Sequence, residues 1–320
     1  MGTHSHPLES ITLQYDAPPR LWAALGRALL RKAPAPGAPL VVPAITAQWR
    51  GARAHAPSLR SYTELCEDNN AAAGVCVPPA PAPYYTFVLP PLFIHAMAMP
   101  LHLAILTHPR FTLPLMGLVH LANRTEMLCP VPPTEALDFT CTLEGVEPGP
   151  KGPQFTLHTS ASVNGKVVWR EQSTYVYPQQ TGATARRRKS AAAFEPDQEV
   201  AQWDVAADAG RRFALPVRDF NPIHLSSFSA RLLGQRTAIA HGLFSAARCL
   251  DVLRQQQPVS TPYVLDVQFK RPLPLPSRVA LYAQAYRQGR KFSLQILDPQ
   301  RGTASQPHLE GTLLPLSDTH

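Results

Sequence analysis

Residues 242–269 read GLFSAARCLDVLRQQQPVSTPYVLDVQF and combine an amphipathic helix with a strand. The apolar residues of the first part recur at the spacing of one helix face, at positions 243, 246, 247, 250 and 253. From Tyr263 to Phe269, side chains that alternate along the chain fit a strand with one face on the core. The stretch therefore predicts a central helix that begins near Gly242 and packs on a sheet.

The same order of elements occurs in both halves of the chain. In the C-terminal half, further strand-like alternations cover residues 279–283, 292–296 and 309–313. In the N-terminal half, PLFIHAMAMPLHLAIL (91–106) is apolar but contains Pro100, so we expect a kinked or delayed helix there. Strands are expected at 137–143, 155–157 and 167–175, and Asn164-Gly165 predicts a tight hairpin turn between two of them.

Composition supports a fold rich in strands and turns. The chain has 35 Pro and 17 Gly, too many prolines for an all-helical bundle. Residues 178–200 lack apolar periodicity and are typical of a linker. We therefore predict four parts, namely an N-terminal extension with one helix (1–56), an N-terminal domain (57–178), a basic linker (179–199) and a C-terminal domain (200–320).

The formal net charge of +8 fits nucleic acid, anionic lipid or a phosphate-bearing substrate as partner. The run Arg186–Lys189 is interpreted as a solvated linker or, second, as a docking patch for an anionic carrier. No nucleic-acid reader motif accompanies it, so nucleic acid is not expected as a partner. Five scattered cysteines without a C-x-x-C pair argue against a disulfide framework or zinc site. With neither a signal peptide nor a membrane span in the sequence, we expect a cytoplasmic protein.

The residues that carry chemistry lie in RDFNPIH (218–224) and in AHGL (240–243). Asn221-Pro222 favours a turn, because a residue before proline avoids the helical region. Such a turn can bring the Asp219 carboxyl group and the His224 imidazole into one small volume. Two titratable groups of different type around one water molecule are what the reversible addition of water requires.

The DFNPIH segment resembles the D-x-N-P-[IVL]-H motif of the MaoC-like, (R)-specific enoyl-CoA hydratase family. AHGL resembles the entry to the hot-dog helix of that family, and VQFKRPL (267–273) resembles a third landmark. The resemblance covers roughly residues 200–315, while 60–178 look like the degenerate N-terminal domain of two-domain members. It implies an α+β double hot-dog fold, with two antiparallel sheets each wrapped around a central helix.

Roles follow from the resemblance position by position. Asp219 and His224 would hold the catalytic water, and Asn221 would pin the loop. The backbone N–H of Gly242, at a helix N-terminus, would face the thioester carbonyl as an oxyanion hole, and glycine would allow close approach. His241 is expected to be a structural or capping residue. Many members have Gly before the aspartate, whereas the cation of Arg218 could lower the pKa of Asp219, which leaves the acid and base roles open.

The implied activity is reversible syn hydration of trans-2-enoyl thioesters of CoA or acyl carrier protein to (R)-3-hydroxyacyl thioesters, without metal or cofactor. The N-terminal half would be catalytically silent and would shape an acyl tunnel, with an ordinary core as the alternative for its residues Leu92, Phe93, Met97, Met99 and Leu103. Asp68-Asn69-Asn70 lacks a downstream Pro and His, and the histidines at 95, 102 and 120 are expected to be half-buried and satisfied. The alternatives are a hot-dog acyl thioesterase and a non-catalytic acyl-carrier binding protein, and a homodimer of double hot dogs is a further expectation.

Overall fold

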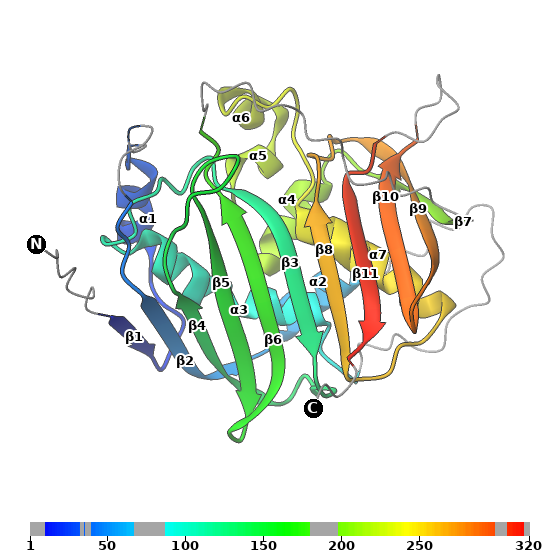
Figure 1. Ribbon diagram of the computed structural model, residues 1–320, viewed down its shortest axis with the longest axis horizontal. Helices are drawn as coiled ribbons and strands as arrows, with labels where there is room; N and C mark the ends of the chain where they lie inside the picture. Colours follow the sequence, from blue (N-terminus) through cyan, green and yellow to red (C-terminus); the bar gives the residue numbers. More distant parts are fainter. Residues whose placement is uncertain are drawn as a thin grey trace, which may run out of the picture.

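A computed structural model describes residues 10–32, 35, 40–66, 87–179, 198–297 and 306–316. Eleven strands form one sheet in the order β1-β2-β4-β5-β6-β3-β8-β11-β10-β9-β7 (Figure 1). In chain order the strands are β1 (Ile11–Tyr15), β2 (Ile45–Arg53), β3 (Val119–Met127), β4 (Ala136–Leu143), β5 (Gln154–Val163), β6 (Lys166–Val176), β7 (Gln198–Val205), β8 (Tyr263–Phe269), β9 (Ser277–Tyr286), β10 (Gly289–Ile296) and β11 (Leu309–Pro315).

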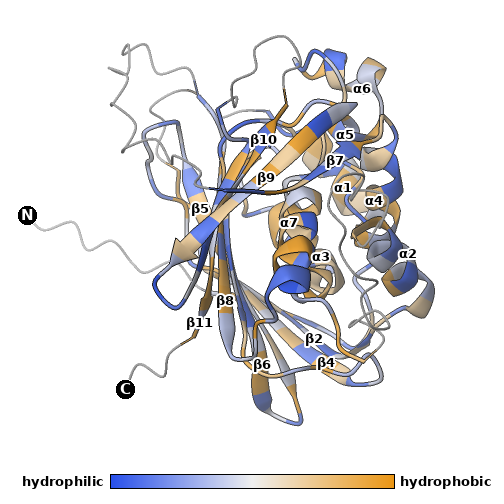
Figure 2. Cartoon of the chain, turned by 90° about the vertical axis from the view of Figure 1, so that its right-hand side faces the viewer, coloured by the Kyte–Doolittle hydropathy of each residue, from blue (hydrophilic) through white to orange (hydrophobic). Residues whose placement is uncertain are grey.

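Two long helices lie on the same side of this sheet (Figure 2). Helix α3 packs on N-terminal strands, including β2 and β4, and α7 packs on the C-terminal strand β11. The helices are α1 (Trp22–Leu29), α2 (Ala56–Cys66), α3 (Pro91–Thr107), α4 (Ala209–Val217), α5 (Pro222–Leu225), α6 (Ser227–Leu232) and α7 (Gly242–Gln256). None of the described helices is long and apolar enough to cross a membrane.

The elements predicted from the decisive stretch are confirmed. Helix α7 begins at Gly242, and β8 spans Tyr263–Phe269 with Leu265 and Val267 fully buried. The β5–β6 hairpin turns at Asn164 and Gly165, whose φ angles of 50° and 79° suit the tight turn that this pair favours. The N-terminal helix is not delayed, because α3 starts at Pro91 and continues through Pro100, whereas the expected kink at Pro100 stays a prediction. It is apolar on nearly all sides and almost wholly buried, so packing outweighs the missing hydrogen bond.

The two antiparallel sheets expected for a double hot-dog fold are joined into one mixed sheet. Strand β3 pairs antiparallel with β8, for example Thr125 with Leu265, and so joins the halves into one sheet. This pairing gives hydrogen-bond partners to the backbone N–H and C=O groups of β3 and β8, which would otherwise be unpaired at the edge of each half. Strand β1 also runs parallel to β2, which makes the sheet mixed. The N-terminal extension thus contributes β1 and the whole of β2 to the sheet in addition to its expected helix, α1.

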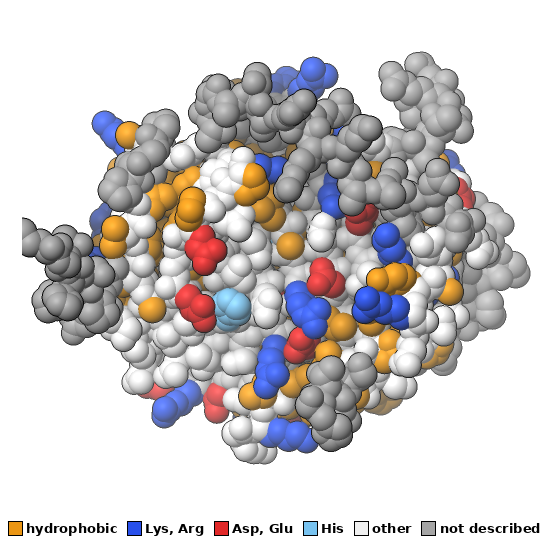
Figure 3. Space-filling model, in the orientation of Figure 1, with side chains coloured by type: hydrophobic (Ala, Val, Ile, Leu, Met, Phe, Trp, Pro, Cys, Tyr) orange, Lys and Arg blue, Asp and Glu red, His pale blue; other side chains and the backbone are white. Residues whose placement is uncertain are grey.

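The face of the sheet that points away from the helices carries charges of both signs (Figure 3). Arg124 lies 3.0 Å from Glu126 and 3.6 Å from Asp266, and Lys270 lies 3.2 Å from Glu310. These are exposed or half-exposed pairs that contribute little to stability. The predicted linker, with Arg186–Lys189, and Asp68-Asn69-Asn70 lie outside the described residues.

Candidate active site

The DFNPIH segment forms the predicted turn between α4 and α5. Helix α4 ends at Val217, and its C-cap residue Arg218 has a left-handed φ of 57°. The Asp219 Oδ1 atom accepts a hydrogen bond of 3.1 Å from the backbone N–H of Asn221. The Asn221 side chain caps α5 by accepting from the N–H of Ile223 at 3.4 Å, with Pro222 at the first helical position. The turn therefore fixes Asp219 through hydrogen bonds that its own sequence supplies.

His224 is held in one tautomer by the backbone. Its Nδ1 atom donates a 2.8 Å hydrogen bond to the carbonyl oxygen of Ile239. Because a carbonyl group only accepts, Nδ1 carries the hydrogen and Nε2 of the neutral ring keeps a lone pair. The backbone of His224 touches Gly210 in α4 so closely that a Cβ atom there would lie 2.1 Å from the His224 carbonyl oxygen. Sequence reasoning did not find Gly210, because its role depends on a contact between two helices.

His241 joins the two groups. Its Nε2 atom donates to the backbone carbonyl of Asp219 at 3.1 Å and lies 3.7 Å from the Asp219 carboxylate. Its ring stacks on His224 with centroids 3.7 Å apart. His241 occupies the N-cap position of α7, but its side chain makes no capping hydrogen bond, so of the two expected roles, structural or capping, the structural one fits. The side chain instead ties Asp219 to His224.

The pKa values of Asp219, His224 and His241 all lie below their ordinary values. Burial raises the pKa of Asp219, but His241, His224 and the N–H of Asn221 outweigh it, and the net pKa lies below the ordinary value. Burial lowers the pKa of His224, opposed by Asp219. Burial and the neighbouring His224 lower the pKa of His241 to about 4. An ionised carboxylate thus faces two neutral imidazoles, and the low pKa of Asp219 arises from the histidines, whereas the sequence had pointed to Arg218.

Gly242 is the first residue of α7, as the sequence predicted. The first N–H groups of a helix have no partner within it and lie at its positive end. A Cβ atom at Gly242 would come within 2.7 Å of the Phe269 ring, so glycine is needed here for packing against β8. The role of the Gly242 N–H as an oxyanion hole, with close approach of the thioester to the backbone, stays a prediction.

Both halves of the chain meet around these residues. The ring of Phe269 packs against that of His120 in β3, with centroids 4.9 Å apart, and His120 stacks on Tyr175 of β6, with centroids 4.5 Å apart. The ring centroid of Phe213 in α4 lies 5.3 Å from that of His241 and 5.6 Å from that of Tyr62 in α2. The proposed tunnel residues Leu92, Phe93 and Met97 are buried in the core. The site is thus enclosed by the N-terminal half as well as by its own domain.

The histidines of the N-terminal half were predicted to be half-buried and satisfied, and this is wrong, wholly or in part, for all three of them. His95 and His102 are each 1% exposed. Among the described residues, one ring nitrogen of each has no hydrogen-bond partner, and the same holds for Nε2 of His120. The side chains of Asp219, His224 and His241 offer ligand atoms within 4.8 Å of one another, so these three residues could also hold a cation.

Comparison with known protein families finds a match in the C-terminal half of the chain. Residues 188–297 match the family described as MaoC like domain. This part of the chain is similar to MaoC-like domains. The matched residues contain the DFNPIH turn, His241 and Gly242.

Relatives extend the likeness to both halves. The chain is 27% identical over 228 residues to 3-hydroxyacyl-thioester dehydratase X of Mycobacterium tuberculosis, covering 70% of this chain and 78% of that protein. A crystal structure of HtdX of M. tuberculosis has a TM-score of 0.67 at 22% identity and covers 85% of this chain and 100% of that one. A MaoC-like dehydratase from Phytophthora capsici has a TM-score of 0.63 at 17% identity and covers 88% and 98%. The likeness in fold therefore extends over most of the chain, beyond the residues that match the family model.

Proposed function

We propose that this protein catalyses the reversible hydration of trans-2-enoyl thioesters to (R)-3-hydroxyacyl thioesters, with Asp219 and His224 acting on one water molecule. The observation that carries the proposal is the joining of an ionised carboxylate and a neutral imidazole, through His241, at the N-terminus of α7. A relative named 3-hydroxyacyl-thioester dehydratase supports the same reaction. The (R) configuration rests on the motif resemblance.

His224 is the better base of the pair. Its Nδ1–H donates to the Ile239 carbonyl oxygen, which leaves a lone pair on Nε2 to accept a proton from water. In hydration, His224 Nε2 takes a proton from water as the oxygen bonds to C3, and the π electrons move toward the thioester carbonyl. The N–H of Gly242 stabilises the resulting enolate oxygen. His224 then returns its proton to C2, while Asp219 orients the water and stabilises the imidazolium.

The rest of the chain has supporting parts in this proposal. Residues 200–320 form the catalytic domain and 57–178 a second hot-dog domain, which completes the sheet through β3. The substrate is delivered by CoA or acyl carrier protein, since both present a thioester on the same arm. The thiols of Cys129, Cys141 and Cys249, which form no disulfide, suit a reducing compartment such as the cytoplasm.

The test is an absorbance assay for loss of enoyl-thioester conjugation across a series of acyl-CoA lengths. Asp219→Asn and His224→Ala should each lower kcat by roughly 10²–10⁴-fold, as expected of a general acid or base. The double variant should lose little more than either single variant, because both groups act on the same water. His158→Ala, on β5, is the matched control and should keep wild-type kcat.

Two results would count against the proposal. If either site variant kept more than about a tenth of the wild-type kcat, the site assignment would be wrong. If the wild-type protein released free CoA thiol faster than it consumed the double bond, the chain would be a thioesterase. An absence of both reactions with every acyl-CoA, together with tight binding of an acyl-carrier thioester, would favour the non-catalytic alternative.

A further inference from the structure

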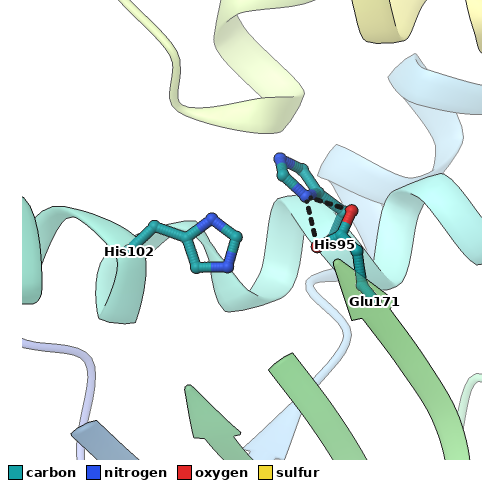
Figure 4. Close-up of side chains that lie close together, drawn as sticks. All are labelled: His95, His102 and Glu171. Carbon is teal, nitrogen blue, oxygen red and sulfur yellow. Dashed lines mark hydrogen bonds and ion pairs between the residues drawn. The ribbon is translucent and has the colours of Figure 1, made fainter. Parts of the chain in front are cut away.

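The core of the N-terminal half contains a polar cluster in a position where a sheet usually packs on apolar residues. His95 and His102 lie two turns apart on α3, and Glu171 projects toward His95 from β6 (Figure 4). None of the three is more than 2% exposed. Asn123 of β3 donates to the Glu171 carboxylate and, at 3.1 Å, to Ser173. Polar side chains from three elements therefore support one buried carboxylate.

This carboxylate is ionised and orients His95. Burial raises the pKa of Glu171, but His95, His102 and Asn123 outweigh it and hold the pKa at about 2. Nδ1 of His95 lies 2.7 and 2.8 Å from the two oxygens of Glu171, so this nitrogen carries the hydrogen and donates it. A carboxylate that fixes an imidazole through Nδ1–H leaves Nε2 free to act on a third group, as in a catalytic triad.

The free nitrogen of His95 has no partner within the described residues and is buried. In Figure 4 it points away from Glu171 toward the chain segment of the C-terminal half that crosses above α3. Helix α3 packs against α4, which leads directly into Asp219. His95 also helps to lower the pKa of Asp219. The centroid of its ring lies 6.5 Å from that of His120. His120 in turn contacts Phe269, which packs beside Gly242.

We propose that the N-terminal half supplies a third polar group to the active site, namely His95 held by Glu171. Its Nε2 atom hydrogen-bonds the water molecule in hydration and the 3-hydroxyl group in dehydration. This inference rests on the proposed function and overturns the expectation that the N-terminal half is catalytically silent. It also accounts for the buried nitrogen, because leaving such an atom unpaired is costly unless substrate or water pairs with it.

The kinetic test compares three glutamine variants with the wild-type protein. His95→Gln should lower kcat for hydration by about 10- to 100-fold, the value of a hydrogen bond to a reacting group. Glu171→Gln keeps an acceptor for Nδ1–H but loses the charge, so it should give a smaller loss and a changed pH profile. His102→Gln is the matched control, since His102 lies on the same helix, is equally buried and pairs with Thr159 at 2.8 Å. It should stay within threefold of wild type.

A second readout separates catalysis from folding. In protein with ¹⁵N-labelled histidine, the Nε2 resonance of His95, assigned with the His95→Gln variant, should shift when (R)-3-hydroxybutyryl-CoA binds. The proposal is overturned if this resonance does not move while His224 responds, or if His95→Gln and His102→Gln lose activity equally. A wild-type protein without hydratase activity would instead refute the proposed function, and an inactive Asp219→Asn beside a normal His95→Gln would refute only this inference.

Discussion

Substitution of Gly210 by alanine tests how tightly α4 positions the candidate base. Gly210 lies near the start of α4, and a Cβ atom there would fall 2.1 Å from the carbonyl oxygen of His224 and 3.1 Å from its carbonyl carbon. An ordinary contact needs at least 3.4 Å, so the backbone of His224 or α4 must move by more than an ångström. Displacement of a catalytic group by about 1 Å costs roughly 10²-fold in rate, so Gly210→Ala should lower kcat by about that factor.

The assay follows loss of enoyl-CoA absorbance, with thermal unfolding measured on the same samples. Gly26→Ala is the control, because Gly26 also lies in a helix and nothing is within 4 Å of a Cβ atom there. This control should keep its activity and gain about 0.5–1 kcal/mol of stability, as is usual for Gly→Ala inside a helix. A Gly210→Ala protein that folds and has kcat within threefold of wild type would refute the assignment of His224.

Three further predictions address stability and assembly. Arg218→Gly should stabilise the fold by about 1 kcal/mol, because Arg218 has a left-handed φ of 57° that glycine adopts freely, and equal urea midpoints for variant and wild type would contradict this. Burial raises the pKa of Asp251 from 3.8 to about 6. The folded state therefore binds this proton more tightly than the unfolded state, and the protein loses stability as the pH rises from 3.8 to about 6. Asp251→Asn should therefore stabilise by up to about 3 kcal/mol at pH 8 and by less at pH 5, as measured by urea unfolding, whereas an equal effect at both pH values would exclude the charge as its cause. Deletion of residues 1–178 should leave the β8 edge unpaired and cause aggregation or self-pairing, and a monodisperse active monomer seen by light scattering would count against the shared sheet.

The sequence predicted elements wherever apolar periodicity is undisturbed. Helix α7 and strands β8 to β11 have regularly spaced apolar residues that face the core, and all were found where expected. Strand β3 was missed for a physical reason. Its inward-facing Asn123 and Thr125 are polar and buried, because they belong to the cluster around Glu171, so the strand shows no apolar alternation. The element that joins the two halves was thus hidden by polar residues in its core-facing positions.

Only the site residues that lie close together in the sequence could be predicted from it. Asp219, Asn221 and His224 lie in one turn, so six consecutive residues reveal them. Gly210 and His241 act through contacts between separate elements, which spacing along the chain does not reveal. The His95–Glu171 pair is 76 residues apart in sequence and depends on the packing of α3 against β6. Its histidine looked like an ordinary core residue, because its partner was not identifiable from the sequence.

The most direct test of the central claim is the stereochemistry of hydration in D₂O. Asp219 and His224 both contact one water molecule in this mechanism, so they act on a single face of the planar enoyl group. The hydroxyl group at C3 and the deuterium at C2 should then be delivered from the same face, and ¹H NMR of the isolated product should show the syn isomer alone. Anti addition, or deuterium distributed over both positions at C2 from the first turnover, would contradict the shared-water mechanism.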